Sequence, residues 1–318
     1  MTDKQINRWL RRQFSRVGLV LLLYHGLMAL LTSVTTLTDL ARQALWAFMT
    51  GDFSRPVDWD LINGNAWGYI AAMVVGFAVL DAWKGQDFRK KEIFAKKSSM
   101  EIRTFLCLLC FCMGAQMANS LWITFLELVL MPFGKSVMPI LESVAGASDT
   151  FSMFLYASIF APIWEELLFR GYVLRSLQPY GRRFAVWGSA ILFGLFHGNL
   201  LQTPYALLMG LVLGYVALEY SIHWAVVLHM FNNLVLADLL TRLTAAWSDI
   251  AYGTLNLILF GGSAVISIVI LLKNRSGIRA YRRDEWMDRR CLKCFFTSGG
   301  ILLLAVLMCG NMVRVFLA

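Results

Sequence analysis

Residues 151–174, FSMFLYASIFAPIWEELLFRGYVL, form a run that is long enough and apolar enough to cross a lipid bilayer as a helix. Three charged side chains interrupt this run: Glu165, Glu166 and Arg170. A charge at the centre of a membrane costs at least about 2.5–3.5 kcal/mol, so such side chains are kept where they have a partner or a function. The three charges therefore mark this helix as the first place to look for a site.

The composition of the 318-residue chain predicts many more helices of this kind. Hydrophobic residues make up 58% of it, the mean hydropathy is +0.61, and 15% of it is charged, whereas soluble domains average about 25% charged residues. We expect an all-α, polytopic integral membrane protein with eight or nine transmembrane helices around an intramembrane polar cavity. The apolar runs are 17–36, 64–83, 104–133, 151–174, 185–200, 204–221, 222–242, 250–272 and 299–317.

The basic residues are distributed as membrane topology requires. Of the 29 lysines and arginines, 23 lie in four segments between apolar runs, at 1–16, 84–103, 175–183 and 273–293. With a cytoplasmic N-terminus and one crossing per run, all four segments fall on the cytoplasmic side, as the positive-inside rule expects. The loops 37–63 and 134–150 then fall outside. The net charge of +9 thus predicts contact with phospholipid headgroups of the bilayer and no nucleic-acid partner.

The spacing in the charged helix separates the two carboxylates. Glu166 and Arg170 are four residues apart with the acid first, which is the favourable order for an ion pair on a helix. Glu165 points about 100° away and stays available for chemistry, at about 15 Å from Arg175 near the headgroups. Pro162 has no N–H for the carbonyl of Ser158, so we expect a kink there. The alternative is an ion-pair network that only fixes helix packing.

Two later helices carry polar groups at a similar depth. In FGLFHGN, His197 follows Phe193 by four residues, and in HMFNN, His229 and Asn233 lie on one helix face, with Asn232 less directly aligned. A lone histidine in a membrane is usually a hydrogen-bond donor between helices. An acid, two histidines and an amide that converge from three helices predict a shared polar site, because each must find a partner or water.

Three motifs in this order resemble those of a known family. EELLFR is similar to the EExxxR motif, FGLFH to FxxxH and HMFNN to HxxxN, as in the type II CAAX prenyl endopeptidases and their bacterial CPBP (CAAX protease and bacteriocin-processing) relatives. The resemblance implies an intramembrane endopeptidase with residues 151–242 as its catalytic core. The hydropathy and charge patterns add N-terminal transmembrane helices in 1–150 and C-terminal transmembrane helices with a basic cytoplasmic loop in 243–318. It implies that Glu165 and His197 activate water and that His229 and Asn233 stabilise the oxyanion.

Metal dependence has two alternatives at this stage. Glu165, His197 and His229 have the ligand types of a His₂Glu zinc site with an open position. We favour water activation without a metal, because it leaves Glu165 as the base and Glu166 with Arg170 as structural support. The expected substrate is a membrane protein or a lipidated, CaaX-type peptide, and the expected location is a bacterial cytoplasmic membrane. Oligomeric state cannot be inferred.

Two other classes of function fit part of the pattern. A membrane immunity or scaffold protein would keep the polar network for packing alone. A proton- or ion-coupled transporter also uses intramembrane glutamates and histidines, but the sequence shows no inverted repeat with matching helix interruptions.

Overall fold

The chain folds into helices throughout its described residues. The computed structural model describes residues 2–95, 97–141, 150–284 and 287–317, and all regular secondary structure in these ranges is helical. The predicted all-α class is confirmed. Lys96, residues 142–149 of the predicted outside loop 134–150, and residues 285–286 of the last basic segment lie outside the described residues.

The helices fall into three groups along the chain. The N-terminal group is α1 (Asp3–Thr50), α2 (Trp59–Asn63), α3 (Trp67–Lys84), α4 (Gln86–Phe88), η1 (Arg89–Ile93), α5 (Ile102–Leu130) and η2 (Met131–Phe133). The central group is α7 (Phe151–Leu155), η3 (Tyr156–Phe160), α8 (Ala161–Glu165), η4 (Glu166–Val173), α9 (Leu174–Leu177), η5 (Gln178–Tyr180), α10 (Arg182–Phe196), α11 (Thr203–Glu219), α12 (Ile222–Met230), η6 (Phe231–Leu239) and α13 (Leu240–Leu243). The C-terminal group is α14 (Asp249–Asn256), η7 (Leu257–Gly261), α15 (Gly262–Lys273), α16 (Arg275–Asp284), α17 (Arg289–Phe296) and α18 (Gly299–Leu317).

Seven helical stretches in the described part of the chain are long and apolar enough to cross a membrane. They are Asp3–Thr50, Trp59–Lys84, Ile102–Phe133, Phe151–Tyr180, Ile222–Leu243, Asp249–Lys273 and Gly299–Phe316. Each overlaps one predicted run, and together they make the protein an integral membrane protein. The number is lower than the predicted eight or nine.

The two remaining predicted runs, 185–200 and 204–221, are the short helices α10 and α11. They have 15 and 17 residues, and at 1.5 Å per residue they reach only about 23 and 26 Å, less than the hydrocarbon core of about 30 Å. The polar turn between them ends α10 before residue 200. The two helices pack against each other as a hairpin, and this turn carries His197.

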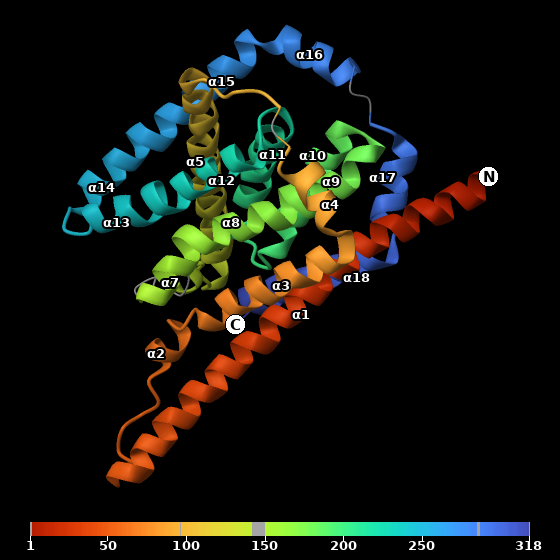
Figure 1. Cartoon of the computed structure of the whole chain (residues 1–318). Coiled ribbons are helices and arrows are strands. Elements are labelled where there is room, and N and C mark those ends of the chain that lie inside the picture. Colours follow the sequence, from red (N-terminus) through yellow and green to blue (C-terminus); the bar gives the residue numbers. More distant parts are fainter. Residues whose placement is uncertain (1, 96, 142–149, 285–286, 318) are drawn as a thin grey trace.

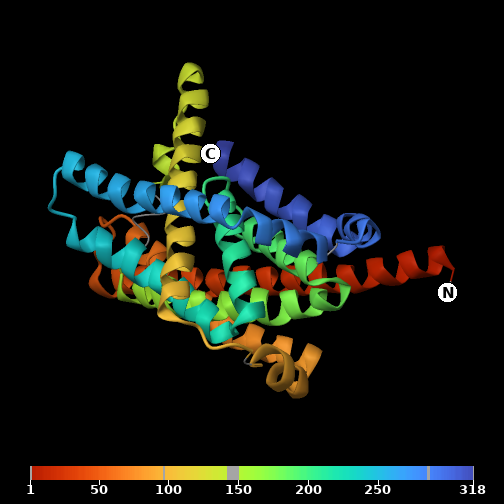
Figure 2. The same cartoon turned by 90° about the horizontal axis from the view of Figure 1, so that it is seen from above.

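Helix α1 is the longest element and differs from its prediction. It begins at a capping box formed by Thr2 and Gln5 and ends only at Gly51, where φ is +69°. Its 48 residues span about 72 Å, so the predicted loop 37–63 starts after Thr50 rather than after residue 36. Helices α3 and α18 pack along α1, while α5 crosses at a steep angle to α1 and packs against α11 and α15 (Figures 1 and 2).

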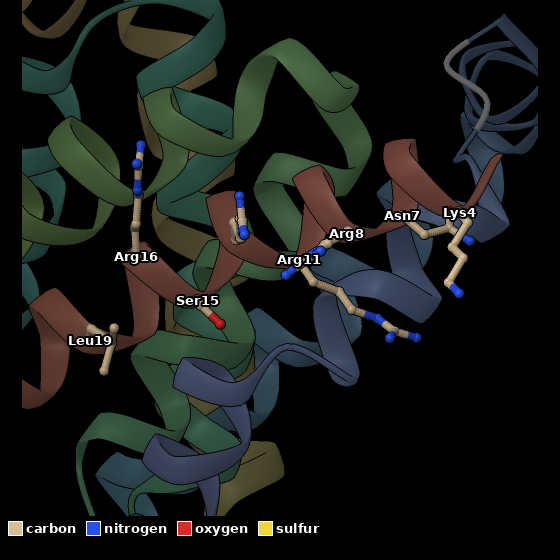
Figure 3. Close-up of a pocket in the computed structure, with 8 residues that line it drawn as sticks. Lys4, Asn7, Arg8, Arg11, Ser15, Arg16 and Leu19 are labelled. Atoms are coloured by element: carbon tan, nitrogen blue, oxygen red, sulfur yellow. The ribbon is translucent and has the colours of Figure 1, made fainter. Parts of the chain in front are cut away.

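The N-terminal part of α1 presents an exposed cationic face (Figure 3). The face lines a groove of about 1030 Å³ and consists of Lys4, Asn7, Arg8, Arg11, Arg12, Ser15, Arg16 and Leu19. No carboxylate belongs to this lining. It leads directly into the apolar part of the helix, which is the charge pattern of a segment that lies among lipid headgroups.

Close backbone contact joins α1 to α18. A Cβ atom at Gly18 would overlap the backbone of Gly300, and the Gly300 amide donates a hydrogen bond to Ser15 Oγ at 3.0 Å. The contact matters for the site, because Asn311 of α18 donates to the Gly198 carbonyl, directly after His197, at 3.0 Å. Helix α1 thus supports the His197 turn through α18.

We expect Gly18→Ala to destabilise the protein, because two packed backbones must separate to admit the methyl group, at a cost of about 1–3 kcal/mol. Gly26→Ala is the matched control on the same helix, since nothing lies within 4 Å of its Cβ position. This control should gain about 0.5–1 kcal/mol from helix propensity. Thermal unfolding in detergent measures both, and equal midpoints for the two variants would contradict the close α1–α18 contact.

Candidate active site

The charged helix is irregular at the positions that matter. The continuous stretch Phe151–Tyr180 contains two π-helical segments, η3 and η4, on either side of the short α8. Single π-helical turns inside α-helices are rare and are frequent at functional sites. Glu165 is the last residue of α8 and Glu166 is the first of η4, so the two carboxylates lie where the helix changes its winding.

Pro162 acts differently from the sequence-based expectation. In η3 the Ala161 N–H pairs with the Tyr156 carbonyl, five residues back. The same register assigns the Ala157 carbonyl to position 162, which has no N–H because it is proline. An α-helical register, which the sequence alone predicts, would instead leave free the carbonyl of Ser158, four residues before Pro162. Asn233 Nδ2 donates to the Ala157 carbonyl at 3.0 Å and fills this gap.

Glu166 and Arg170 form a buried ion pair. Arg170 Nη1 lies 3.2 Å from Glu166 Oε1, and both side chains are 0% exposed. The contact is ionic, since no guanidinium nitrogen of Arg170 has an aligned hydrogen-bond acceptor among the described residues. The guanidinium also lies 4.2 Å from the centroid of the Phe193 ring, where the negative face of the ring attracts a cation. Arg170 is thereby shared between η4 and α10.

Glu166 has a second partner that the sequence did not indicate. His229 Nδ1 lies 2.9 Å from Glu166 Oε1. Because a carboxylate only accepts, this geometry places a proton on Nδ1 and turns Nε2 away from Glu166. His229 Nε2 lies 3.8 Å from Glu165 Oε2, beyond hydrogen-bonding distance. The two carboxylates therefore lie on either side of one imidazole, and Glu166 orients His229 toward Glu165.

His197 is held by the end of its own helix. Its Nδ1 lies 2.9 Å from the Phe193 carbonyl, which only accepts, so a neutral ring presents the lone pair of Nε2. The chain then turns at Gly198, where φ is +62°. The Phe193 ring makes edge contacts with both imidazoles, with centroids 4.9 Å from His197 and 5.9 Å from His229. Phe193 thus separates and orients the two histidines.

A chain of hydrogen bonds fixes the Asn233 amide. Tyr205 donates from its hydroxyl to Asn232 Oδ1 at 2.7 Å, and Asn232 Nδ2 donates to Asn233 Oδ1 at 3.0 Å. These contacts fix which end of the Asn233 amide is the oxygen. If the amide were flipped, Oδ1 would face the Ala157 carbonyl oxygen, and two acceptors would be opposed. One N–H of Asn233 Nδ2 remains for another acceptor. Tyr205 was missed because only its position in the fold relates it to the motif.

The four predicted catalytic side chains line one cavity of about 940 Å³. Glu165 is 25% exposed and His229 6% exposed at their side chains, and His197 and Asn233 are half-buried. Further polar residues of the lining include Gln116 and Asn119 of α5, together with Tyr205 and Asn232. A partly exposed carboxylate facing fixed hydrogen-bond donors, inside an apolar body, is an arrangement suited to activating water and stabilising an oxyanion.

The zinc alternative needs its three donors gathered around one point. The described ranges contain no group of three histidine, cysteine, aspartate or glutamate side chains placed to hold a metal ion. Glu165, His197 and His229, as they stand, therefore do not make up a three-ligand site of the catalytic zinc type.

Comparison with known proteins identifies the segment that carries the four predicted catalytic side chains. Residues 147–235 match the family model described as type II CAAX prenyl endopeptidase Rce1-like. No curated protein and no solved structure matches the chain. The family match confirms the resemblance to the CPBP family for this segment, which covers Glu165, His197, His229 and Asn233. Helices α1 and α5 lie outside it.

Removal of Arg170 tests the buried network. Arg170→Leu leaves the Glu166 charge buried beside His229 only, and it should lower the free energy of unfolding by about 3–5 kcal/mol. The double variant Glu166→Gln/Arg170→Leu should recover most of this loss, because glutamine still accepts from His229 and carries no charge. Arg279→Leu, at an exposed position, is the control. Denaturant unfolding in mixed micelles measures all four proteins. A double variant as unstable as the single one would contradict the ion pair.

Proposed function

We propose that the protein is an intramembrane endopeptidase that hydrolyses a peptide bond of a membrane-associated protein or peptide. The observation that carries the proposal is the convergence of Glu165, His197, His229 and Asn233 on one cavity, within a segment that matches Rce1-like endopeptidases. For the substrate we propose a lipidated, CaaX-type peptide whose reacting bond enters the cavity from the bilayer. The family match supports this class, and the surrounding apolar helices suit such a substrate.

In the proposed mechanism Glu165 is the general base. Its carboxylate is partly exposed to the cavity and makes no ion pair with Arg170, so it is free to take a proton from water. His197 offers the lone pair of Nε2 and helps to orient that water, since its Nδ1 is occupied by the Phe193 carbonyl. The resulting hydroxide attacks the carbonyl carbon of the substrate, and the carbonyl oxygen becomes an oxyanion.

The oxyanion is stabilised by donors from the helix that carries His229 and Asn233. One Asn233 N–H is held against Ala157, and the other is available to the oxyanion. When His229 is protonated both ring nitrogens donate, Nδ1 to Glu166 and Nε2 to the oxyanion. Donors fixed in advance are most effective in a site from which bulk water is excluded. The oxyanion then collapses to the carbonyl, the C–N bond breaks, and Glu165 returns its proton to the leaving amine.

The cationic segments support an orientation with the N-terminus in the cytoplasm. The α1 face in Figure 3 would lie among the headgroups of the cytoplasmic leaflet, with Leu19 at the start of the apolar span. The cavity would then open within the bilayer to substrates that are themselves anchored in it.

Replacement of the proposed base gives the decisive test of activity. Glu165→Gln should lower kcat for a fluorescent, membrane-tethered lipidated peptide by about 10²–10⁴-fold, because general-base catalysis contributes that much. Glu101→Gln, an exposed glutamate at the start of α5, should leave kcat unchanged. Assays of the purified protein in nanodiscs, with a strong divalent-metal chelator in parallel, measure both effects.

Under the proposed mechanism the chelator leaves the wild-type rate unchanged. Loss of the rate on chelation and its return with added Zn²⁺ would reject water activation without a metal. Undiminished turnover by Glu165→Gln would reject Glu165 as the base, and no turnover by the wild-type chain would favour a scaffold role for the network.

A further inference from the structure

Two amide side chains on α5 face the same cavity and have no part in the mechanism above. Gln116 and Asn119 are three residues apart and so lie on one face of the helix. Both line the cavity that contains Glu165, His197 and His229. They occupy the middle of α5, a 29-residue helix, which places them at about the depth of the bilayer midplane.

Asn119 is unusual because it is buried without a partner. The residue is 8% exposed, and its enclosed Oδ1 makes no hydrogen bond to any residue that the structure describes. The hydroxyl side chains of this part of α5 behave differently: Ser120 donates to the Gln116 carbonyl at 3.1 Å and Thr124 to the Ser120 carbonyl at 2.9 Å. An amide that is buried and unpaired destabilises a fold. Folding therefore does not explain why position 119 is asparagine.

We propose that Asn119, with Gln116, forms a subsite that binds the peptide backbone of the substrate, which rests on the proposed endopeptidase function. A peptide drawn into the bilayer brings N–H and C=O groups that must be paired there. Asn119 lines the cavity, but its Oδ1 is enclosed in the empty site, so the amide turns about its terminal torsion on binding and Oδ1 then accepts from a backbone N–H of the bound peptide. Gln116 offers both a donor and an acceptor to the neighbouring peptide group. Backbone binding needs no particular substrate side chain, so it holds peptides of different sequence.

Helix α5, which carries this subsite, lies outside the segment that contains the three motifs. The family match covers residues 147–235, whereas α5 comes from the preceding part of the chain and packs against α11 and α15. Residues outside the matched segment therefore also line the cavity, both on α5 and after residue 235. The matched segment supplies the proposed reacting groups, and α5 supplies a wall that holds the peptide.

Binding measurements with an inactive background separate this proposal from catalysis. The full chain carrying Glu165→Gln is placed in nanodiscs and titrated with a fluorescent farnesylated CaaX-type peptide. It is then titrated with depsipeptides in which one backbone N–H at a time is replaced by an ester oxygen. One of these esters should bind about 10-fold more weakly than the amide, because a single hydrogen bond to Asn119 is lost.

The added substitution Asn119→Leu should abolish that difference and weaken binding of the all-amide peptide by about 10-fold. Gln116→Leu should weaken binding without removing the difference at the same ester. Ser120→Ala, on the exposed side of α5, should bind as the background does. A thermal-unfolding midpoint accompanies each variant, and for Asn119→Leu it should stay equal or rise, since an unpaired buried oxygen is removed.

Three results would overturn the subsite. The first is that the Asn119→Leu protein and its background bind the peptide with equal affinity. The second is that the weaker binding of the ester persists in Asn119→Leu. The third is a lowered unfolding midpoint of Asn119→Leu together with unchanged discrimination between ester and amide, as a purely structural role of Asn119 predicts. Absence of saturable binding to any of these proteins overturns it as well. Failure of the protease proposal is seen separately, as absence of cleavage by the wild-type chain.

Discussion

The buried carboxylate of Glu166 is the interaction on which the site depends. In a membrane it cannot be left uncompensated, and it has two partners from two directions, Arg170 on its own helix and His229 on α12. Arg170 in turn lies over Phe193 of α10. One charge thus couples three helices and sets the orientation of the imidazole that faces Glu165. A shift of any of these helices would separate charges inside an apolar body.

The second constraint is the winding of the helix that carries both glutamates. Because η3 pairs residues five apart, Pro162 leaves the Ala157 carbonyl without a donor, and Asn233 supplies one. The same amide is the proposed oxyanion donor, so a defect in one helix orients a reacting group on another. The π-helical segments are therefore part of how the site is assembled. The backbone hydrogen bond that the Ala157 carbonyl lacks within its own helix is replaced by one from Asn233 on a neighbouring helix.

Much of this arrangement could be predicted from the sequence. Hydropathy indicated the long helices, and the i, i+4 spacing indicated the contact of Glu166 with Arg170. The length of α1 could not be predicted, because it depends on where capping and packing end a helix. The hydrogen bond from His229 to Glu166 and the burial of Asn119 were out of reach for a related reason: both are properties of helices that meet only in the fold.

The hydrogen bond between His229 and Glu166 can be measured directly. The chain has four histidines, so ¹⁵N spectra of histidine-labelled protein in nanodiscs can be assigned by single substitutions. A protonated Nδ1 for His229, with a chemical shift that changes in Glu166→Gln, is the result that the structure predicts. An unprotonated Nδ1, or a shift that Glu166→Gln leaves unchanged, would contradict the account, because the hydrogen bond to Glu166 is what turns Nε2 of the ring toward Glu165.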